Sequence, residues 1–575
     1  MLLSKIFANK KKSREISPED IFLDARNVSD FDVDSSEGVF EKPFLKDSFI
    51  IISGFTFVIF VVFLFKAYSL QVTNYSEWAT RSINNYIKKA FIFSYRGMIR
   101  DRNGVALAWN DSVDSKLTTL SEIPLRHYIE DEGFSNLLGT VSYPKRDKSG
   151  YFWQDDYVGV DGLEKYYNDN LSGTKGDRIV EVDVKGEVVR DNVLNNPVDG
   201  KVLNLNIDSK VQSIFYNRLS EVVRARGFDG GSGILMDITN GEVIAAASYP
   251  DFDNNVFVNA TTTEDRKTKN SFLSQKDTPM LNRALSGLYV PGSVVKPFMA
   301  YAALKEGVID EYTNIFSSGQ LVIKNKYGGP DTIFRDWKAH GYVDVRSAIA
   351  VSSDEYFYQV GGGFKDQVGL GIKRIDQYMS MFGFASTTGV DFIAEKTSII
   401  PTPEWKKKNF EDGDWLLGNT YHSSIGQYGY KTSPIALARS VGIIATGGKI
   451  IIPSIARTET SSARPIYSQV LDLNKANLLS VRDGMKKSAS EGGTAHYFDN
   501  LPFSVGAKTG TAQLGYKNER VNSWSTGYYP YDNPKYVFVF MMENGPSSNT
   551  VGASKIMRQV FQDMLDLKLP YVTFN

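Results

Sequence analysis

The stretch VPGSVVKPF, at residues 290–298, places a lysine three positions after a serine, with Pro-Gly before the pair and Pro-Phe after it. The Pro-Gly pair interrupts any preceding regular structure, and Pro297 is well tolerated in a helix only within the first turn. The stretch therefore predicts a helix that begins close to Ser293. Because side chains three positions apart share one face of a helix, Lys296 can reach Ser293.

This pair suits nucleophilic catalysis. A serine hydroxyl becomes a good nucleophile when a base takes its proton, and a neutral lysine amine can be that base if desolvation and a second cation disfavour its charged form. The alternative is a helix-capping serine beside a solvated lysine, and the pair alone does not exclude it. The question is therefore where a second cation comes from.

A later stretch, VGAKTGTAQ at residues 505–513, supplies a second lysine. It places Lys508 and two hydroxyl residues, Thr509 and Thr511, on a predicted strand. Gly510 lies between them and allows a ligand or another chain to approach closely. The edge of such a strand can also pair with an extended peptide.

A third stretch, AVSSDEYFYQVG at residues 350–361, lies between the other two and holds Ser352 and Asp354. A hydroxyl and a carboxylate two positions apart can take part in proton transfer. In a loop they can equally form a local turn. This stretch therefore indicates catalysis only in combination with the other two stretches.

The composition excludes several other kinds of chemistry. The chain has 575 residues, 42% hydrophobic and 13% aromatic, which is enough for several packed domains. Its 65 Lys and Arg nearly balance its 66 Asp and Glu, so charge selects no nucleic acid partner. The chain has no cysteine, which excludes disulfides, thiolate metal ligands and a cysteine nucleophile. Any nucleophile is therefore an oxygen or a nitrogen.

One segment predicts a membrane anchor. FIIISGFTFVIFVVFLF, at residues 49–65, has no charge and is apolar on all faces, which disfavours a buried core helix. It follows a long polar segment and precedes no A-x-A site, so a cleaved signal peptide is disfavoured too. We expect a membrane helix over residues 47–70, after a loosely ordered tail at residues 1–46.

The remaining pattern predicts an α+β fold. GSGILMDITNGEVIAAAS, at residues 231–248, indicates two strands joined by an Asn-Gly turn. Helical patterns follow at residues 297–307 and 433–448, and strand patterns return at residues 535–543. We expect strands from both ends of this region to meet in one sheet that helices cover. Before it, KVLNLNI at residues 201–207 alternates as a half-buried strand does.

Taken in order, S-x-x-K, S-x-D and K-T-G resemble the active-site motifs of penicillin-binding proteins and serine β-lactamases. From the anchor to its C-terminus the chain resembles a class B penicillin-binding protein, in particular the elongation-type penicillin-binding protein 2. Four further stretches are similar to this family: RGMIRDRNGVALA (96–108), GVDGLEKYYNDNLSGTKG (159–176), NIDSKVQ (206–212) and SIGQYGYKTSPIALA (424–438).

The resemblance implies a fold and a topology. It implies one transmembrane helix, an elongated β-rich pedestal at residues 71–227, and a serine β-lactamase-like transpeptidase domain at residues 228–575, with an antiparallel sheet covered by helices. The tail would be cytoplasmic and everything after the helix extracytoplasmic, which means periplasmic in a cell that has an outer membrane.

The resemblance also implies a reaction without cofactor or metal. The chain would be a peptidoglycan D,D-transpeptidase that forms an acyl-enzyme on Ser293, with Lys296 taking the serine proton. Ser352, helped by Lys508, would relay protons toward the leaving amine. Thr509, Gly510 and Thr511, which follow Lys508 in the K-T-G-T stretch, would bind the substrate carboxylate. Backbone N–H groups of Ser293 and Thr511 would form an oxyanion hole.

The implied partners are stem peptides of nascent, lipid II-derived glycan, β-lactam antibiotics, a SEDS-type glycosyltransferase and other elongation-complex membrane proteins. Alternatives stay open. A β-lactamase shares the three motifs but needs a residue that activates water, and no E-x-x-L-N stretch is present. A β-lactam sensor of the receptor type has several spans. A scaffold without catalysis would not need all four of Ser293, Lys296, Ser352 and Lys508.

Several residues depart from the family pattern. Asp354 stands where Asn is usual, which is similar to elongation-type members, although a division-type role stays open. Tyr428 lengthens the family's G-Q-G to G-Q-Y-G and has no explanation in the sequence. We expect His340 to have a structural or loop role rather than to bind metal, and Trp337 to be a packing residue.

Overall fold

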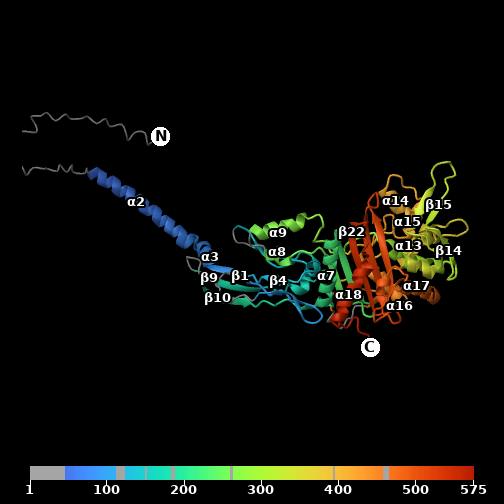
Figure 1. Ribbon diagram of the computed structural model, residues 1–575. Helices are drawn as coiled ribbons and strands as arrows, with labels where there is room; N and C mark the ends of the chain where they lie inside the picture. The colour runs from blue at the N-terminus through green and yellow to red at the C-terminus, as the bar shows by residue number, and fades with distance from the viewer. Residues whose placement is uncertain are drawn as a thin grey trace, which may run out of the picture. The chain divides into compact units, whose positions relative to one another are not determined.

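The computed structural model describes residues 46–111, 123–148, 152–182, 188–259, 263–392, 395–457 and 465–574 (Figure 1). The chain separates into two units, Met1–Tyr86 and Ile87–Asn575. Each unit is described by itself.

The first unit contains the predicted membrane helix. Helix α2 (Lys46–Tyr68) continues through one π-helical turn, η2 (Ser69–Thr73), and is followed by α3 (Tyr75–Tyr86). Residues Phe49–Thr73 are long and apolar enough to cross a membrane, and none of their most apolar stretch is buried by protein. By its length and composition this segment can serve as a membrane anchor. The expected tail at residues 1–46 lies outside the described residues except for Lys46.

The second unit begins with a β-rich part of short strands. A three-stranded antiparallel sheet has the order β1-β9-β10, and a four-stranded sheet has the order β11-β2-β3-β4. The strands are β1 (Ile87–Ile92), β2 (Ile99–Arg100), β3 (Ala106–Asn110), β4 (Arg126–Tyr128), β9 (Gly176–Val182), β10 (Val188–Asn195) and β11 (Leu203–Asn204). Two hairpin-like pairs, β5 (Val141–Ser142) with β8 (Val158–Gly159) and β6 (Lys145–Arg146) with β7 (Phe152–Gln154), and three short helices, α4 (Ser135–Leu138), α5 (Gly162–Tyr166) and α6 (Asn168–Leu171), complete it.

The strand predicted at residues 201–207 is much shorter than expected. Only β11, Leu203–Asn204, pairs with β2. The chain leaves the sheet because the Asp208 side chain accepts hydrogen bonds from the backbone N–H groups of Lys210 and Val211, which starts the next helix.

A buried cluster of charges holds this β-rich part together. Glu164 accepts from Arg96 Nε at 2.5 Å and from Arg126 Nε at 2.8 Å, and all three side chains are fully buried. Burial alone raises the pKa of Glu164, but the charges and hydrogen bonds of Arg126 and Arg96 outweigh burial and hold that pKa below its usual value. Glu164 therefore stays ionised in the folded chain.

We expect Glu164→Gln to destabilise the chain by about 3 to 5 kcal/mol, because two buried guanidinium groups lose their counter-charge. Urea unfolding followed by fluorescence measures this. Because the folded pKa of Glu164 is lowered, its contribution is present above the unfolded value of about 4.3 and is lost as the pH falls through the folded pKa. Glu221→Gln is the control, since Glu221 forms an exposed ion pair with Arg218. An equal loss in both variants would contradict this role of Glu164.

The rest of the second unit is built on a five-stranded antiparallel sheet with the order β13-β12-β22-β21-β20. Its strands are β12 (Gly230–Asp237), β13 (Val243–Tyr249), β20 (Gly506–Leu514), β21 (Arg520–Tyr529) and β22 (Tyr536–Pro546). Ile234 on β12 pairs with Ala246 on one side and Val539 on the other. The predicted meeting of early and late strands in one sheet is thus confirmed, and Figure 1 shows the red late strands beside the green early ones.

Helices cover both faces of this sheet. The first helix, α7 (Ser209–Arg226), packs on β12 and β13, and the last, α18 (Ala553–Asp566), packs on β21 and β22. Helix α16 (Pro434–Thr446) packs on β12, β21 and β22, and α17 (Lys475–Ser488) packs on β20. Since β20 is at the edge of the sheet, only one of its two edges pairs with another strand of the sheet.

The remaining elements lie between β13 and β20 in the sequence. The helices are α8 (Asn254–Asn259), α9 (Thr263–Ser274), α10 (Lys296–Lys305), α11 (Val345–Val351), α12 (Asp354–Gly362), α13 (Gly371–Met381), α14 (Pro403–Asn409), α15 (Leu417–Ser424) and two 3₁₀ turns, η3 (Gly292–Val295) and η4 (His496–Phe498). Three small antiparallel pairs join β14 (Ile315–Ser317) to β17 (Gly341–Val343), β15 (Gln320–Ile323) to β16 (Thr332–Arg335), and β18 (Lys449–Ile451) to β19 (Tyr467–Val470).

Candidate active site

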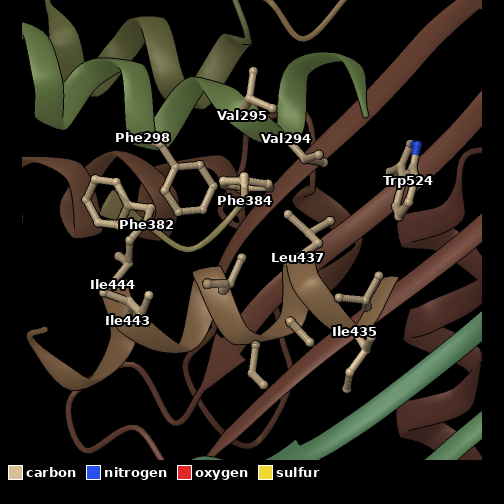
Figure 2. Packing of buried hydrophobic residues seen from close by; sticks show 14 of the residues in the cluster. Val294, Val295, Phe298, Phe382, Phe384, Ile435, Leu437, Ile443, Ile444 and Trp524 are labelled. Carbon is tan, nitrogen blue, oxygen red and sulfur yellow. The ribbon is translucent and has the colours of Figure 1, made fainter. Parts of the chain in front are cut away.

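Ser293 lies in the 3₁₀ turn η3, and the α-helix begins only at Lys296. The predicted start of a helix close to Ser293 is therefore confirmed, but its first turn is 3₁₀ rather than α-helical. Pro297 occupies the first turn of α10. Fully buried side chains on both sides of Lys296 fix the turn: Val294, Val295 and Phe298. Figure 2 shows Phe298 beside Phe382 and Phe384, with ring centroids 5.1 Å apart in each pair.

The edge strand β20 fits directly against this turn. A Cβ atom on Gly510 would lie 2.8 Å from the Pro291 carbonyl oxygen and 2.9 Å from Val294 Cγ1. Only glycine allows this approach, which confirms the expectation that Gly510 marks close contact. On the neighbouring strand, Trp524 Nε1 donates to the Val290 carbonyl oxygen at 2.9 Å. The sheet thereby sets the position of Ser293.

Ser352 lies between two helices. It directly follows the last residue of α11, and its backbone is left-handed with φ of 59°. Ser353 then caps α12 by accepting from the Tyr356 N–H, and Asp354 is the first residue of that helix. This backbone turns the hydroxyl of Ser352 and the carboxylate of Asp354 toward the same lysine.

Two buried lysines converge on Ser352. Lys296 Nζ donates to the Ser352 carbonyl oxygen at 2.7 Å, to Ser352 Oγ at 3.3 Å and to Asp354 Oδ1 at 2.5 Å. Lys508 Nζ donates to the same Ser352 Oγ at 2.8 Å and to the Thr509 carbonyl oxygen at 2.7 Å. The second cation that the sequence required is thus Lys508.

The charges of these lysines are coupled. Both side chains are fully buried, and only Lys296 has a carboxylate partner among the described ion pairs. Burial and then the positive charge of Lys296 lower the pKa of Lys508 well below its usual value, and Asp354 raises it by less. Burial and the charge of Lys296 therefore favour the neutral amine form of Lys508.

Ser293, Ser352, Asp354, Thr509, Gly510 and Thr511 line one cleft of about 1140 Å³. Within the described part of the chain no hydrogen bond joins Ser293 Oγ to Lys296, whose amine is directed to Ser352 and Asp354. A nucleophile and its base are often loosely aligned before substrate binds. The structure thus places all the predicted residues at one site and leaves the serine hydroxyl free.

Asp336, which no motif in the sequence indicated, holds the residues of the middle motif in place. Its fully buried carboxylate accepts from Ser353 Oγ at 2.7 Å and from the Glu355 N–H at 2.9 Å. Asp336 precedes Ser352 by 16 positions, so no local spacing could have revealed it. His340, also buried, lies 3.6 Å from Asp336. The described residues contain no group of three or more His, Cys, Asp and Glu side chains that could hold a metal.

Two further cleft residues differ from the sequence analysis. Trp337, expected to be a packing residue, is 57% exposed and lines the cleft, with Nε1 donating to the Val351 carbonyl oxygen at 3.2 Å. Thr494 accepts from Thr509 Oγ1 at 2.8 Å, and no motif in the sequence predicted this contact. Its only local signal is the preceding Gly-Gly, which marks a turn.

A half-buried serine beside two buried lysines that share a second hydroxyl is the arrangement of a serine acyl-transfer enzyme. The comparisons with known proteins agree. Residues 231–566 match the penicillin-binding protein transpeptidase domain, and residues 116–205 match the penicillin-binding protein dimerisation domain.

The relatives and solved structures that the chain resembles are of the same kind. It is 30% identical to the peptidoglycan D,D-transpeptidase MrdA of Haemophilus influenzae, over 88% of this chain and 89% of that protein. It is similar to penicillin-binding protein 2 of Helicobacter pylori in complex with MreC, with 26% identity, TM-score 0.66, and 84% and 99% of the two chains covered. A chain of a peptidoglycan synthase complex, described for its coordination of polymerization and crosslinking, gives 27% identity, TM-score 0.68, and 90% and 98% coverage.

The chain therefore belongs to the penicillin-binding proteins with a transpeptidase domain, and among them to the elongation-type class B members.

Proposed function

We propose that this chain is a serine D,D-transpeptidase that cross-links peptidoglycan stem peptides during cell elongation, with Ser293 as the nucleophile. The observation that carries the assignment is the pair of buried lysines on the two sides of Ser352 Oγ. Elongation, rather than division, is supported by the similarity to MrdA proteins along nearly the whole chain.

In the first half-reaction Ser293 Oγ attacks the carbonyl carbon of the penultimate D-alanine, and its proton passes to Lys296 Nζ. The Oγ–C bond forms, the C–N bond to the terminal D-alanine breaks, and the leaving nitrogen receives a proton through Ser352. In the second half-reaction an amine of a neighbouring stem peptide attacks the ester carbonyl carbon. The new C–N bond forms and the C–Oγ bond breaks. The proton that the amine loses passes through Ser352 to Lys296, which returns a proton to Ser293 Oγ.

Lys296 must be neutral when it takes the serine proton. In the resting site Asp354 is its counter-ion, and burial favours a neutral Lys508. A substrate carboxylate bound at Thr509 and Thr511 favours the ammonium form of Lys508. A proton then moves from Lys296 through the Ser352 hydroxyl to Lys508, which leaves Lys296 as the free base.

This route distinguishes Ser352 from Asp354. We expect Ser352→Ala to lower the rate of acylation by penicillin at least about 100-fold, because the hydroxyl that both lysines contact is lost. Asp354→Asn should cost less, since an amide oxygen in the same position still accepts from Lys296. Stopped-flow acylation of the two variants measures the difference. A dead Asp354→Asn enzyme beside an active Ser352→Ala enzyme would contradict the route.

The topology and partners follow from the same assignment. We propose that residues 1–46 are cytoplasmic, that residues 47–70 cross the membrane, and that the pedestal (71–227) and the transpeptidase domain (228–575) are extracytoplasmic. The partners would be lipid II-derived nascent glycan, a SEDS-type glycosyltransferase and other membrane proteins of the elongation complex. Similarity to the MreC complex and to a chain of a synthase complex supports such assemblies.

The test of the proposed function uses the full chain in detergent with a synthetic pentapeptide that ends in D-Ala-D-Ala and an amine acceptor. We expect release of D-alanine and formation of the exchanged peptide, both dependent on Ser293. Rapid turnover of penicillin to its hydrolysed form, without exchange, would indicate a β-lactamase instead. A folded chain that reacts with neither substrate would indicate a scaffold.

A further inference from the structure

A second pocket lies outside the active-site cleft. It has a volume of about 760 Å³, and none of the residues that line it lines the cleft. The end of α13, the loop after it, α16 and the pair of β18 and β19 contribute to its lining. Among the described residues that line it, Arg439 of α16 alone carries a charge. The pocket is therefore built around one cation.

The guanidinium of Arg439 is buried without a carboxylate in contact. The residue is only 3% exposed. Its Nη1 donates to the Thr387 carbonyl oxygen at 2.7 Å, and its Nη2 donates to the carbonyl oxygens of Gly383 and Ser386 and to Ser386 Oγ. Its Nε has no hydrogen-bond partner among the residues that the structure describes. Neutral oxygens thus accept its hydrogen bonds, and none of them compensates its charge.

Burial of this charge is unfavourable. It lowers the pKa of Arg439 to about 10, and the attraction of Glu395 raises that pKa by less. The carboxylate of Glu395 instead accepts from the backbone N–H groups of Thr388 and Gly389. Since Arg439 is still protonated at neutral pH, an anion in the pocket would offset the cost of burying its charge.

The guanidinium has a fixed position. A Cβ atom on Gly383 would lie 2.8 Å from Arg439 Nη2 and 3.1 Å from Nε, so only glycine leaves room for the guanidinium here. The residues on either side of Gly383, Phe382 and Phe384, are buried against Phe298 (Figure 2). The loop that holds Arg439 is therefore anchored in the core, and the pocket does not have to form when a ligand binds.

The rest of the lining is partly polar and partly apolar. Hydroxyl groups come from the loop after α13 and from Ser468 on β19. The apolar side chains, which we call the apolar wall, are all half-buried: Met381, Ile450, Ile452 and Leu471. A ligand that suits this lining has a polar head and a short apolar part, and the pocket has the size of a small-molecule site. One lining cation matches an anion with one negative charge, and a carboxylate can accept two hydrogen bonds from a guanidinium.

We propose that this pocket binds a small amphiphilic carboxylate, whose charged head pairs with Arg439 and whose apolar part lies on the apolar wall. This site is separate from Ser293 and adds a ligand to the chain beyond the proposed function.

The test is a titration of 6,6,6-trifluorohexanoate with the full chain in detergent, followed by ¹⁹F NMR, with detergent alone as the blank. We expect saturable binding. The neutral 6,6,6-trifluorohexanamide has nearly the same shape and should bind at least about tenfold more weakly. Arg439→Met should weaken binding of the carboxylate at least about tenfold as well, which is the size of a lost hydrogen bond to a charged group.

Two further variants separate binding from folding, because Arg439 also holds the loop after α13. Ser468→Trp leaves every contact of Arg439 in place and fills the pocket from the exposed strand β19, so it should weaken binding to the same degree. Arg558→Met is the control, since Arg558 donates to Gln562 on α18 and does not line the pocket. Its affinity for the carboxylate should stay within about twofold of the unchanged chain.

Three results would overturn the pocket as a binding site: no saturable binding by the unchanged chain, equal affinity for the amide, or unchanged affinity in Ser468→Trp. A chain whose Ser293 already carries a penicillin should bind the carboxylate as before. Loss of binding after this acylation would place the anion in the active-site cleft, which also overturns the proposal and leaves the proposed function intact.

Discussion

Ser293→Ala is expected to abolish covalent labelling by a fluorescent penicillin, whereas the unchanged chain is labelled to one molecule per chain. The two hydroxyls beside it in the described site are engaged: Ser352 Oγ accepts from two lysines, and Thr509 Oγ1 donates to Thr494. The residual rate should be that of the uncatalysed reaction. Gel fluorescence after a timed incubation with the full chain measures the effect.

The fold should survive this change, because only one oxygen atom is lost from a half-buried side chain. A thermal unfolding midpoint within about one degree of the unchanged chain is the control. Labelling of a folded Ser293→Ala protein at a comparable rate would place the nucleophile elsewhere.

The second large effect concerns Lys296. Lys296→Met keeps most of the side-chain volume and removes the amine, so acylation at neutral pH should slow by about 100- to 10,000-fold, the range over which a positioned general base acts. Asp354 loses its cation at the same time, so some loss of stability is expected as well. Stopped-flow measurement of the acylation rate constant, combined with an unfolding curve, separates the two effects.

Lys305→Met is the matched control, because Lys305 ends the same helix α10 and is exposed. Its acylation rate should stay within about twofold of the unchanged chain, as surface substitutions away from special features have little effect. A Lys296→Met protein that is acylated at the normal rate would show that another group takes the serine proton.

The active-site residues were predictable because residues that act together here lie close to one another in the sequence. Ser293 and Lys296 lie one turn apart, and Gly510 marks the strand that fits against them. The strands at both ends of the domain were predictable for a different reason, since β12 and β22 are buried along most of their length, as short apolar runs are in a sheet with helices on both faces.

What could not be predicted depends on contacts between distant segments. The 3₁₀ turn at Ser293 results from packing against β20, which lies more than 200 positions later. Asp336 supports Ser353 through a tertiary hydrogen bond, and Trp337 is exposed because its loop lies at the rim of the cleft. The ring of Tyr428 packs against those of Trp405 and Phe410. No pattern local to these residues encodes such contacts.

The central claim is that Ser293 is an acylable nucleophile, and intact mass spectrometry tests it most directly. The full chain is incubated with benzylpenicillin, and its mass and its peptides are measured. The account predicts a mass increase of one drug molecule, located on the peptide that contains Ser293. A folded chain without an adduct, or with the adduct on another residue, would contradict it.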